Sequence, residues 1–157
     1  MKNLLLSVFL FVSAMPLWSQ IVTEKDFQGK WKLVSYTTKD ATLDVATGKA
    51  TVNEASQKNL GPEFTAKLIE EMEALANEYH NDYLEFKGKK FSMFVDDKIT
   101  KGTYKITRDK ENNQVVVATF KDTSKSTVPI NLHEGKLVIE QRYTGRIFTF
   151  VKEEPIK

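Results

Sequence analysis

Cysteine is absent from the 157-residue sequence, so neither disulfides nor thiolate-bound metals can hold the fold together. The same absence excludes a lipid-modified cysteine near the N-terminus. A small domain without disulfides has to be stabilised by its own hydrophobic core. The chain is long enough for one such domain, because proteins near 150 residues bury roughly 68–70% of the surface that the unfolded chain exposes.

Motifs that carry common enzyme chemistry are also missing. The 7 glycines stand singly, so no phosphate-binding loop or dinucleotide fingerprint is present, and no Gly-x-Ser-x-Gly elbow occurs. A metal site at either histidine, His80 or His133, would need further ligands from elsewhere in the chain. We therefore expect no catalytic residue, no metal and no cofactor. An enzyme that acts on a bound ligand through His80, Tyr104 and Arg146 is the minor alternative.

No block of like charge stands out, because the 23 basic and 21 acidic residues are interspersed. The densest basic cluster is "KGKK", Lys87 to Lys90, which we interpret as a solvated hairpin turn. A phosphate backbone is normally bound by longer basic tracts. The sequence therefore predicts no nucleic-acid partner.

The one long hydrophobic run lies at the N-terminus. A lysine precedes the apolar stretch Leu4 to Val12, and small or turn-forming residues follow it. The run is too short to span roughly 30 Å of hydrocarbon as a helix. We interpret residues 1–19 as a secretory signal peptide, with cleavage near Ser19 or Ala14. The protein is then expected to be periplasmic or secreted, not membrane-spanning and not a lipoprotein, with residues 20–157 as one domain.

Eight later segments alternate apolar and polar residues, which predicts strands with one buried face. Turn-forming residues separate the segments after residue 82, so successive strands are expected to be antiparallel neighbours. Short strands at this spacing favour a β-sandwich or a barrel. The segments span 27–36, 82–88, 90–96, 98–107, 114–120, 126–132, 136–143 and 145–152.

One segment follows a helical period instead. Apolar residues recur at helical spacing, which predicts an amphipathic helix over about 61–80; they are Phe64, Leu68, Met72, Leu75 and Tyr79. The stretch 39–59 before it is polar and reads as a loop. The first and second predicted strands are therefore about forty residues apart. The inserted helix could act as a lid or only pack against the barrel.

The triplet Gly29-Lys30-Trp31 near the start of the first strand resembles the Gly-x-Trp motif of the lipocalins. The resemblance implies a mainly β fold, an eight-stranded antiparallel up-and-down barrel of the calycin type. It also implies a barrel floor at which a basic residue from the last strand covers the tryptophan. Lys152 stands where most lipocalins have arginine, so the expected floor residues are Gly29, Trp31 and Lys152. The C-terminal helix of many lipocalins is missing, and the inserted helix is an addition.

Strand alternation predicts which side chains face the interior. It places Trp31, Leu33 and Ser35 inside and their neighbours, Tyr36 included, outside. Arg146 shares a face with Phe148 and Phe150 and, by the lipocalin arrangement, lies at the open end. Arg146 is therefore the candidate for meeting an anionic head group.

The leading hypothesis is non-enzymatic binding of a small hydrophobic or amphipathic ligand inside the barrel or at its mouth. The alternative is a protein-interaction or structural module with a filled barrel, which docks a partner through the inserted helix or the rim. Which molecule would bind is left open. The candidate ligand-binding residues are Arg146, Tyr104, Phe91, Met93, Leu137, Ile139, Phe148 and Phe150.

Overall fold

The computed structural model describes residues 21–95, 97–141 and 143–154. The predicted signal peptide, residues 1–19, lies outside the described residues. The described chain has one hydrophobic core that runs through the barrel and into the inserted segment.

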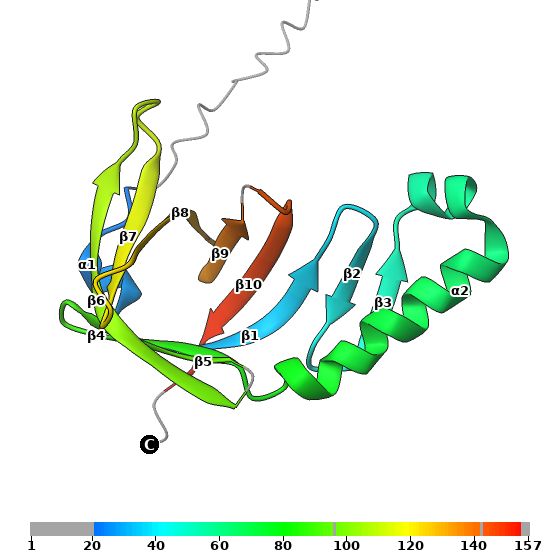
Figure 1. Cartoon of the computed structure of the whole chain (residues 1–157), viewed down its shortest axis with the longest axis horizontal. Helices are drawn as coiled ribbons and strands as arrows, with labels where there is room; N and C mark the ends of the chain where they lie inside the picture. Colours follow the sequence, from blue (N-terminus) through cyan, green and yellow to red (C-terminus); the bar gives the residue numbers. More distant parts are fainter. Residues whose placement is uncertain (1–20, 96, 142, 155–157) are drawn as a thin grey trace, which may run out of the picture.

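The predicted eight-stranded antiparallel barrel is confirmed (Figure 1). Each barrel strand pairs with the next along the chain, and the last strand pairs back with the first to close the barrel. Closure leaves these strands without free edges. The barrel strands are β1 (Gly29–Thr37), β4 (Tyr83–Lys87), β5 (Lys90–Val95), β6 (Lys98–Arg108), β7 (Gln114–Phe120), β8 (Lys125–His133), β9 (Lys136–Gln141) and β10 (Arg146–Lys152).

The segment between β1 and β4 contains more structure than the predicted helix. It forms a hairpin of β2 (Ala41–Asp44) and β3 (Lys49–Val52), followed by helix α2 (Glu54–Tyr79). We call β2, β3 and α2 the wing, because they project sideways from the barrel (Figure 1). The prediction of a loop over 39–59 was wrong: β2 pairs with the second half of β1, and β3 pairs with β2.

Helix α2 begins earlier than the sequence predicted. Asn53 is its N-cap, and the Asn53 side chain accepts a hydrogen bond from the Ser56 backbone N–H at 2.9 Å. The helix is interrupted at Gly61, whose φ of 74° is left-handed, and Pro62 opens the second segment. The predicted start near residue 61 is therefore an internal break. Met72 and Ala76 are buried on the β2–β3 hairpin, but Phe64 is 63% exposed.

A β-bulge in β1 changes which residues face inward. The register of β1 against β10 shifts between Leu33 and Ser35, so Ser35 pairs with Thr149 and Tyr36 pairs with Phe148. The extra residue reverses the alternation beyond it. Trp31 and Leu33 are buried, as alternation predicted, whereas the prediction for Ser35 and Tyr36 was wrong, because Tyr36 is the buried residue. The bulge lies where β1 leaves β4 and begins to pair with β2.

Candidate functional site

The closed end of the barrel is built around Trp31. In the sheet Trp31 pairs with Leu84 on one side and with Lys152 on the other. Its indole Nε1–H donates to the Phe27 backbone oxygen at 2.7 Å, and Lys152 Nζ lies 5.5 Å from the indole centroid. Gly29 has a φ of 110°, and a Cβ there would lie 3.0 Å from Lys152 Cε. The structure thus brings together the three residues expected at the floor.

A short helix before β1 completes this end. Helix α1 (Glu24–Phe27) places Phe27 inside the barrel, 5.1 Å from Phe86 and 6.1 Å from Tyr104 between ring centroids. Gln28 follows, and its Nε2 donates to the Tyr104 hydroxyl and to the Gly88 carbonyl, each at 3.1 Å. The Gly88 N–H donates back to Gln28 Oε1 at 2.7 Å. The prediction that the first strand begins at residue 27 was wrong, because Phe27 ends α1, Gln28 is the C-cap of α1 and β1 begins at Gly29. Neither Phe27 nor Gln28 was expected at the floor.

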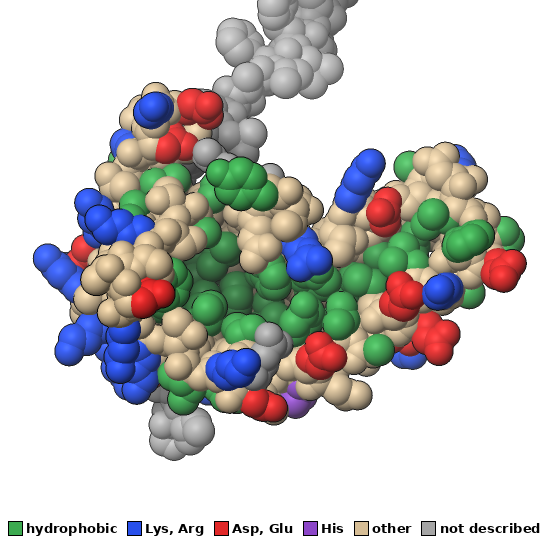
Figure 2. Space-filling model, viewed as in Figure 1, with side chains coloured by type: hydrophobic (Ala, Val, Ile, Leu, Met, Phe, Trp, Pro, Cys, Tyr) green, Lys and Arg blue, Asp and Glu red, His purple; other side chains and the backbone are tan. Residues whose placement is uncertain are grey.

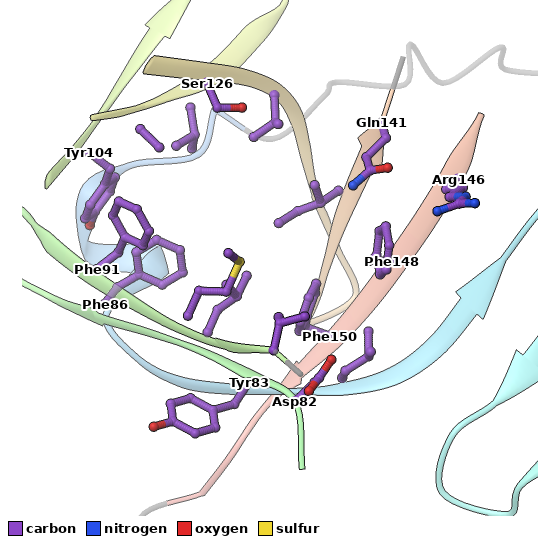
Figure 3. Close-up of a pocket in the computed structure, with 18 of the residues that line it drawn as sticks. Asp82, Tyr83, Phe86, Phe91, Tyr104, Ser126, Gln141, Arg146, Phe148 and Phe150 are labelled. Carbon is purple, nitrogen blue, oxygen red and sulfur yellow. The ribbon is translucent and has the colours of Figure 1, made fainter. Parts of the chain in front are cut away.

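Above this floor the barrel encloses a cavity of about 480 Å³ (Figure 3). Its walls are mostly aromatic and aliphatic side chains from the barrel strands. All but one of the residues expected to contact a ligand line it, namely Phe91, Met93, Tyr104, Ile139, Arg146, Phe148 and Phe150. Leu137 does not: it is fully buried in the core at 0% exposure.

Two polar residues stand at the rim of the cavity. Arg146, at the start of β10, pairs in register with Gln141, at the end of β9, and both are exposed. Figure 3 shows both side chains beside the opening, above Phe148. Tyr104 differs from them, because it lies at the deep end and its hydroxyl is bonded to Gln28. Burial raises the pKa of Tyr104 above its ordinary value, so the phenol stays neutral.

Asp82 is a cavity residue that sequence reasoning missed. It lies between α2 and β4, is 3% exposed and lines the cavity wall near Phe150 (Figure 3). The Asp82 backbone oxygen accepts from the Leu33 N–H at 3.1 Å, and its own N–H donates to the Tyr79 oxygen at 3.1 Å. These bonds fix its position where β1 turns away from β4. An acid just before a strand gives no sequence signal for burial.

The wing meets the cavity at one place. Of the residues of α2, only Tyr79 lines the cavity. The Tyr79 ring lies 5.2 Å from that of Tyr36, which lies 5.2 Å from that of Phe148. The rest of α2 packs on β2 and β3, so the helix does not cover the mouth as a lid. The aromatic contacts connect the wing core to the upper wall of the cavity.

Neither histidine lies in the cavity. His80 is the C-cap of α2, and His133 lies at the end of β8, with its Nε2 3.6 Å from the Glu134 carboxylate. Within the described ranges, no group of three or more His, Asp or Glu side chains is placed to hold a metal ion. In the same ranges, no helix is both long and apolar enough to cross a membrane.

Comparisons with known proteins do not assign the chain to a family. No protein-family model and no curated protein matches the chain. A crystal structure of a DUF4847 family protein from Bacteroides vulgatus ATCC 8482 is similar at 15% identity, over 85% of this chain and 98% of that one, with a TM-score of 0.49. That likeness carries no information about a ligand. The barrel agrees with the fold implied by the lipocalin resemblance, and membership of that family stays a prediction.

Proposed function

We propose that the protein binds a small hydrophobic or amphipathic molecule, without covalent chemistry, in the barrel cavity. The observation that carries this proposal is the cavity of about 480 Å³ above a closed floor. Ligand sites typically have roughly 300–1,000 Å³, apolar walls and a few polar groups that fix orientation. Both features are present here.

The polar groups favour one orientation of an amphipathic ligand. The floor is filled by Trp31 and Phe27, so the apolar part of the ligand enters from the mouth. An anionic head group is then placed at the rim, beside Arg146, where it keeps contact with water. The ligand class supported best is therefore an apolar body with a neutral or anionic head.

Two other functions have less support. The interaction-module hypothesis assumed a filled barrel, and the cavity removes that premise. The enzyme hypothesis combined His80, Tyr104 and Arg146, but His80 does not line the cavity, and Tyr104 and Arg146 lie at its opposite ends.

Native mass spectrometry of protein purified from its own host, without detergent, tests the binding proposal. We expect a non-covalent adduct of small-molecule mass that is released when the protein is denatured. Ligand-free protein that also fails to take up an added amphiphile would contradict the proposal.

We also infer that the protein is exported to the periplasm or secreted. The support is the sequence of residues 1–19, which lies outside the described residues. N-terminal sequencing of protein from the envelope and from the medium tests this inference. A mature chain that begins near residue 20 supports it, and an intact N-terminus in the cytoplasmic fraction contradicts it.

A further inference from the structure

Charge is distributed unevenly over the described chain. Strands β5 to β8 contain no Asp or Glu, and their cationic residues are Lys90, Lys98, Lys101, Lys105, Arg108 and Lys125. Helix α2 has the opposite balance, with Glu54, Glu63, Glu70, Glu71, Glu73 and Glu78 against Lys58 and Lys67. Figure 2 shows Lys and Arg side chains gathered on the barrel side away from the wing, and acidic side chains along the wing. The near-neutral total charge conceals this separation.

The strand register brings the lysines of β5 to β8 onto one outer surface. Lys90 pairs with Thr103, Thr103 with Thr119, and Thr119 with Lys125, which makes one row across four strands. In β6 the outward-facing Thr103 and Lys105 flank Tyr104, which faces inward. The row therefore points away from the cavity. We call Lys89, Lys90, Lys101, Lys105 and Lys125 the lysine face; all five are exposed.

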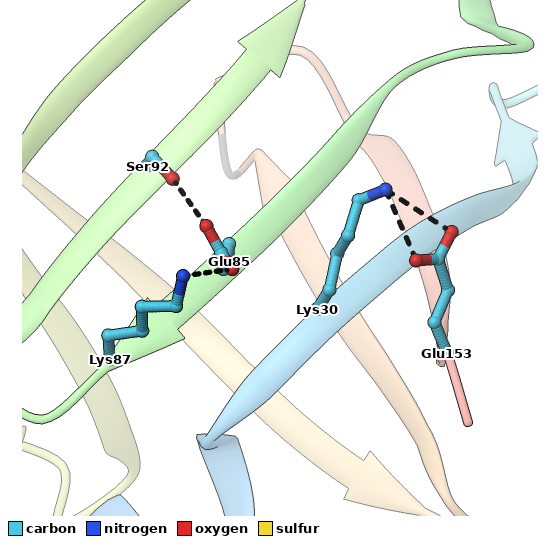
Figure 4. A network of polar contacts seen from close by, with 5 residues as sticks. All are labelled: Lys30, Glu85, Lys87, Ser92 and Glu153. Atoms are coloured by element: carbon cyan, nitrogen blue, oxygen red, sulfur yellow. Dashed lines mark hydrogen bonds and ion pairs between the residues drawn. The ribbon is translucent and has the colours of Figure 1, made fainter. Parts of the chain in front are cut away.

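Ion pairs within the described part of the chain do not neutralise the charge of the lysine face. Among the described residues, no acid lies within ion-pair distance of any of the five lysines. Glu85 on the adjacent strand is engaged by Lys87 at 2.8 Å and by the Ser92 hydroxyl at 3.4 Å (Figure 4). Glu153 pairs with Lys30 at 3.1 Å (Figure 4). Glu85 and Glu153 are thus paired with lysines outside the lysine face.

A hollow and an apolar row accompany these lysines. Lys89, Lys105 and Lys125 line a surface hollow of about 400 Å³, in which one anionic group can approach all three. On the same outer surface Tyr83 pairs with Phe94, and Phe94 pairs with Ile99, which is 56% exposed. Lys101 lies two residues from Ile99 on the same face of β6, and a lysine beside an exposed aliphatic side chain is typical of surfaces that rest on a lipid bilayer.

We propose that the lysine face docks on an anionic lipid surface, with Ile99 contacting the boundary between head groups and acyl chains. Charge complementarity supports a polyanionic partner, and the apolar row favours lipid over nucleic acid, which offers no acyl layer to an aliphatic side chain. Lysine suits this role, because it acts as a point charge without the fixed geometry of an arginine fork. The acidic α2 is repelled by the same surface, so the wing points away from it.

Flotation with phosphatidylcholine vesicles, with and without an equal part of phosphatidylglycerol, tests the proposal on the full-length mature protein. We expect binding only to the phosphatidylglycerol vesicles, and a steep loss of binding as salt is raised. Lys89→Gln/Lys105→Gln/Lys125→Gln should lower the partition coefficient about tenfold or more. The matched control Lys39→Gln/Lys58→Gln/Lys67→Gln removes the same charge from α2 and from the turn before β2, and should bind as the wild type does.

A second variant tests the apolar contribution. Ile99→Ser should weaken vesicle binding several-fold while the slope of the salt dependence stays the same, because no charge is changed. Far-UV circular dichroism and thermal unfolding check that every variant is folded.

Three results would overturn the proposal. They are equal binding to both kinds of vesicle, binding to neither, and equal loss of binding in the lysine-face variant and its matched control. Inorganic phosphate and duplex DNA serve as soluble anions: if the lysine face binds either of them while vesicles are not bound, the surface recognises anions other than lipid.

Discussion

The two ends of the barrel are made by the same strands but are built in different ways. At the floor, Trp31, Phe27 and Gln28 fill the space, and side chain–backbone hydrogen bonds tie α1 to the first strand and to the β4–β5 turn. At the mouth the same strands leave a cavity of about 480 Å³, and the polar rim residues Arg146 and Gln141 are exposed. Substitutions at the floor should therefore change stability, whereas substitutions at the mouth should change binding.

The largest effect is expected at the centre of the floor. Trp31→Ala removes a side chain that is 2% exposed and leaves a cavity, which should lower the free energy of unfolding by about 3–5 kcal/mol. Urea unfolding followed by circular dichroism measures the change. Lys32→Ala, one residue along and facing outward, should change it by less than about 0.5 kcal/mol. Equal effects of the two substitutions would contradict the assignment of Trp31 to the floor.

A smaller loss of stability is expected at Gln28. Gln28→Ala removes the partner of the buried Tyr104 hydroxyl and of the Gly88 N–H, which should cost about 1–2 kcal/mol. The same urea unfolding experiment measures it. Gln28→Glu keeps the size and one acceptor but loses the donor, so an intermediate value is expected. No loss in Gln28→Ala would show that this end does not depend on the Gln28 bonds.

At the mouth, Arg146→Gln should change binding without changing stability. Removing the cation at the rim should weaken binding of dodecanoate about tenfold, equivalent to about 1.4 kcal/mol. Dodecanol, which has no anionic head, should bind both forms equally, and the unfolding free energy should stay within about 0.5 kcal/mol. Isothermal titration calorimetry measures both affinities. Equal weakening for the acid and the alcohol would mean that Arg146 does not act through charge.

The smallest expected effect is a pH dependence at the start of α1. The Asp26 carboxylate accepts from the Thr23 hydroxyl and from the Thr23 N–H, both at 2.7 Å, which lowers the pKa of Asp26 below its ordinary value. Because the folded pKa is the lower one, the contribution is present above the unfolded pKa of about 4 and is lost as pH falls through the folded pKa.

The Asp26 contribution should be about 0.5 kcal/mol or less, since the group is solvent-screened. Comparing the unfolding free energies of wild type and Asp26→Asn at neutral and acidic pH measures it. The difference between the two should shrink as pH falls. A difference that stays constant with pH would show that the ionised carboxylate is not what stabilises this turn.

The barrel could be predicted from the sequence because its evidence is repeated along the chain. Each strand has several alternating apolar residues, so Phe91 and Met93 on β5 or Phe148 and Phe150 on β10 predict the same interior independently. The same alternation placed Arg146 on the cavity side, where the structure has it. A fold prediction that rests on alternation in many strands stays correct even where one strand departs from the alternation.

Features that depend on a single residue or on a distant partner could not be predicted in this way. The β1 bulge adds one residue and reverses the orientation of Tyr36, yet nothing in the local sequence marks it. Strands β2 and β3 have four residues each, which is too short for a period to show. Asp82 is buried only because β1 and β4 separate there, a consequence of the wing.

The most direct test of the difference between floor and mouth fills the cavity while Trp31, Phe27 and Gln28 at the floor stay unchanged. Ala118→Phe places a ring in the cavity, and its neighbour Val117 faces outward, so Val117→Phe is the matched control. Calorimetric titration with dodecanoate should show saturable one-site binding to the wild type and to Val117→Phe, and no binding to a folded Ala118→Phe. Equal binding by both variants, or no saturable binding by the wild type, would contradict the proposal that this cavity is a ligand site.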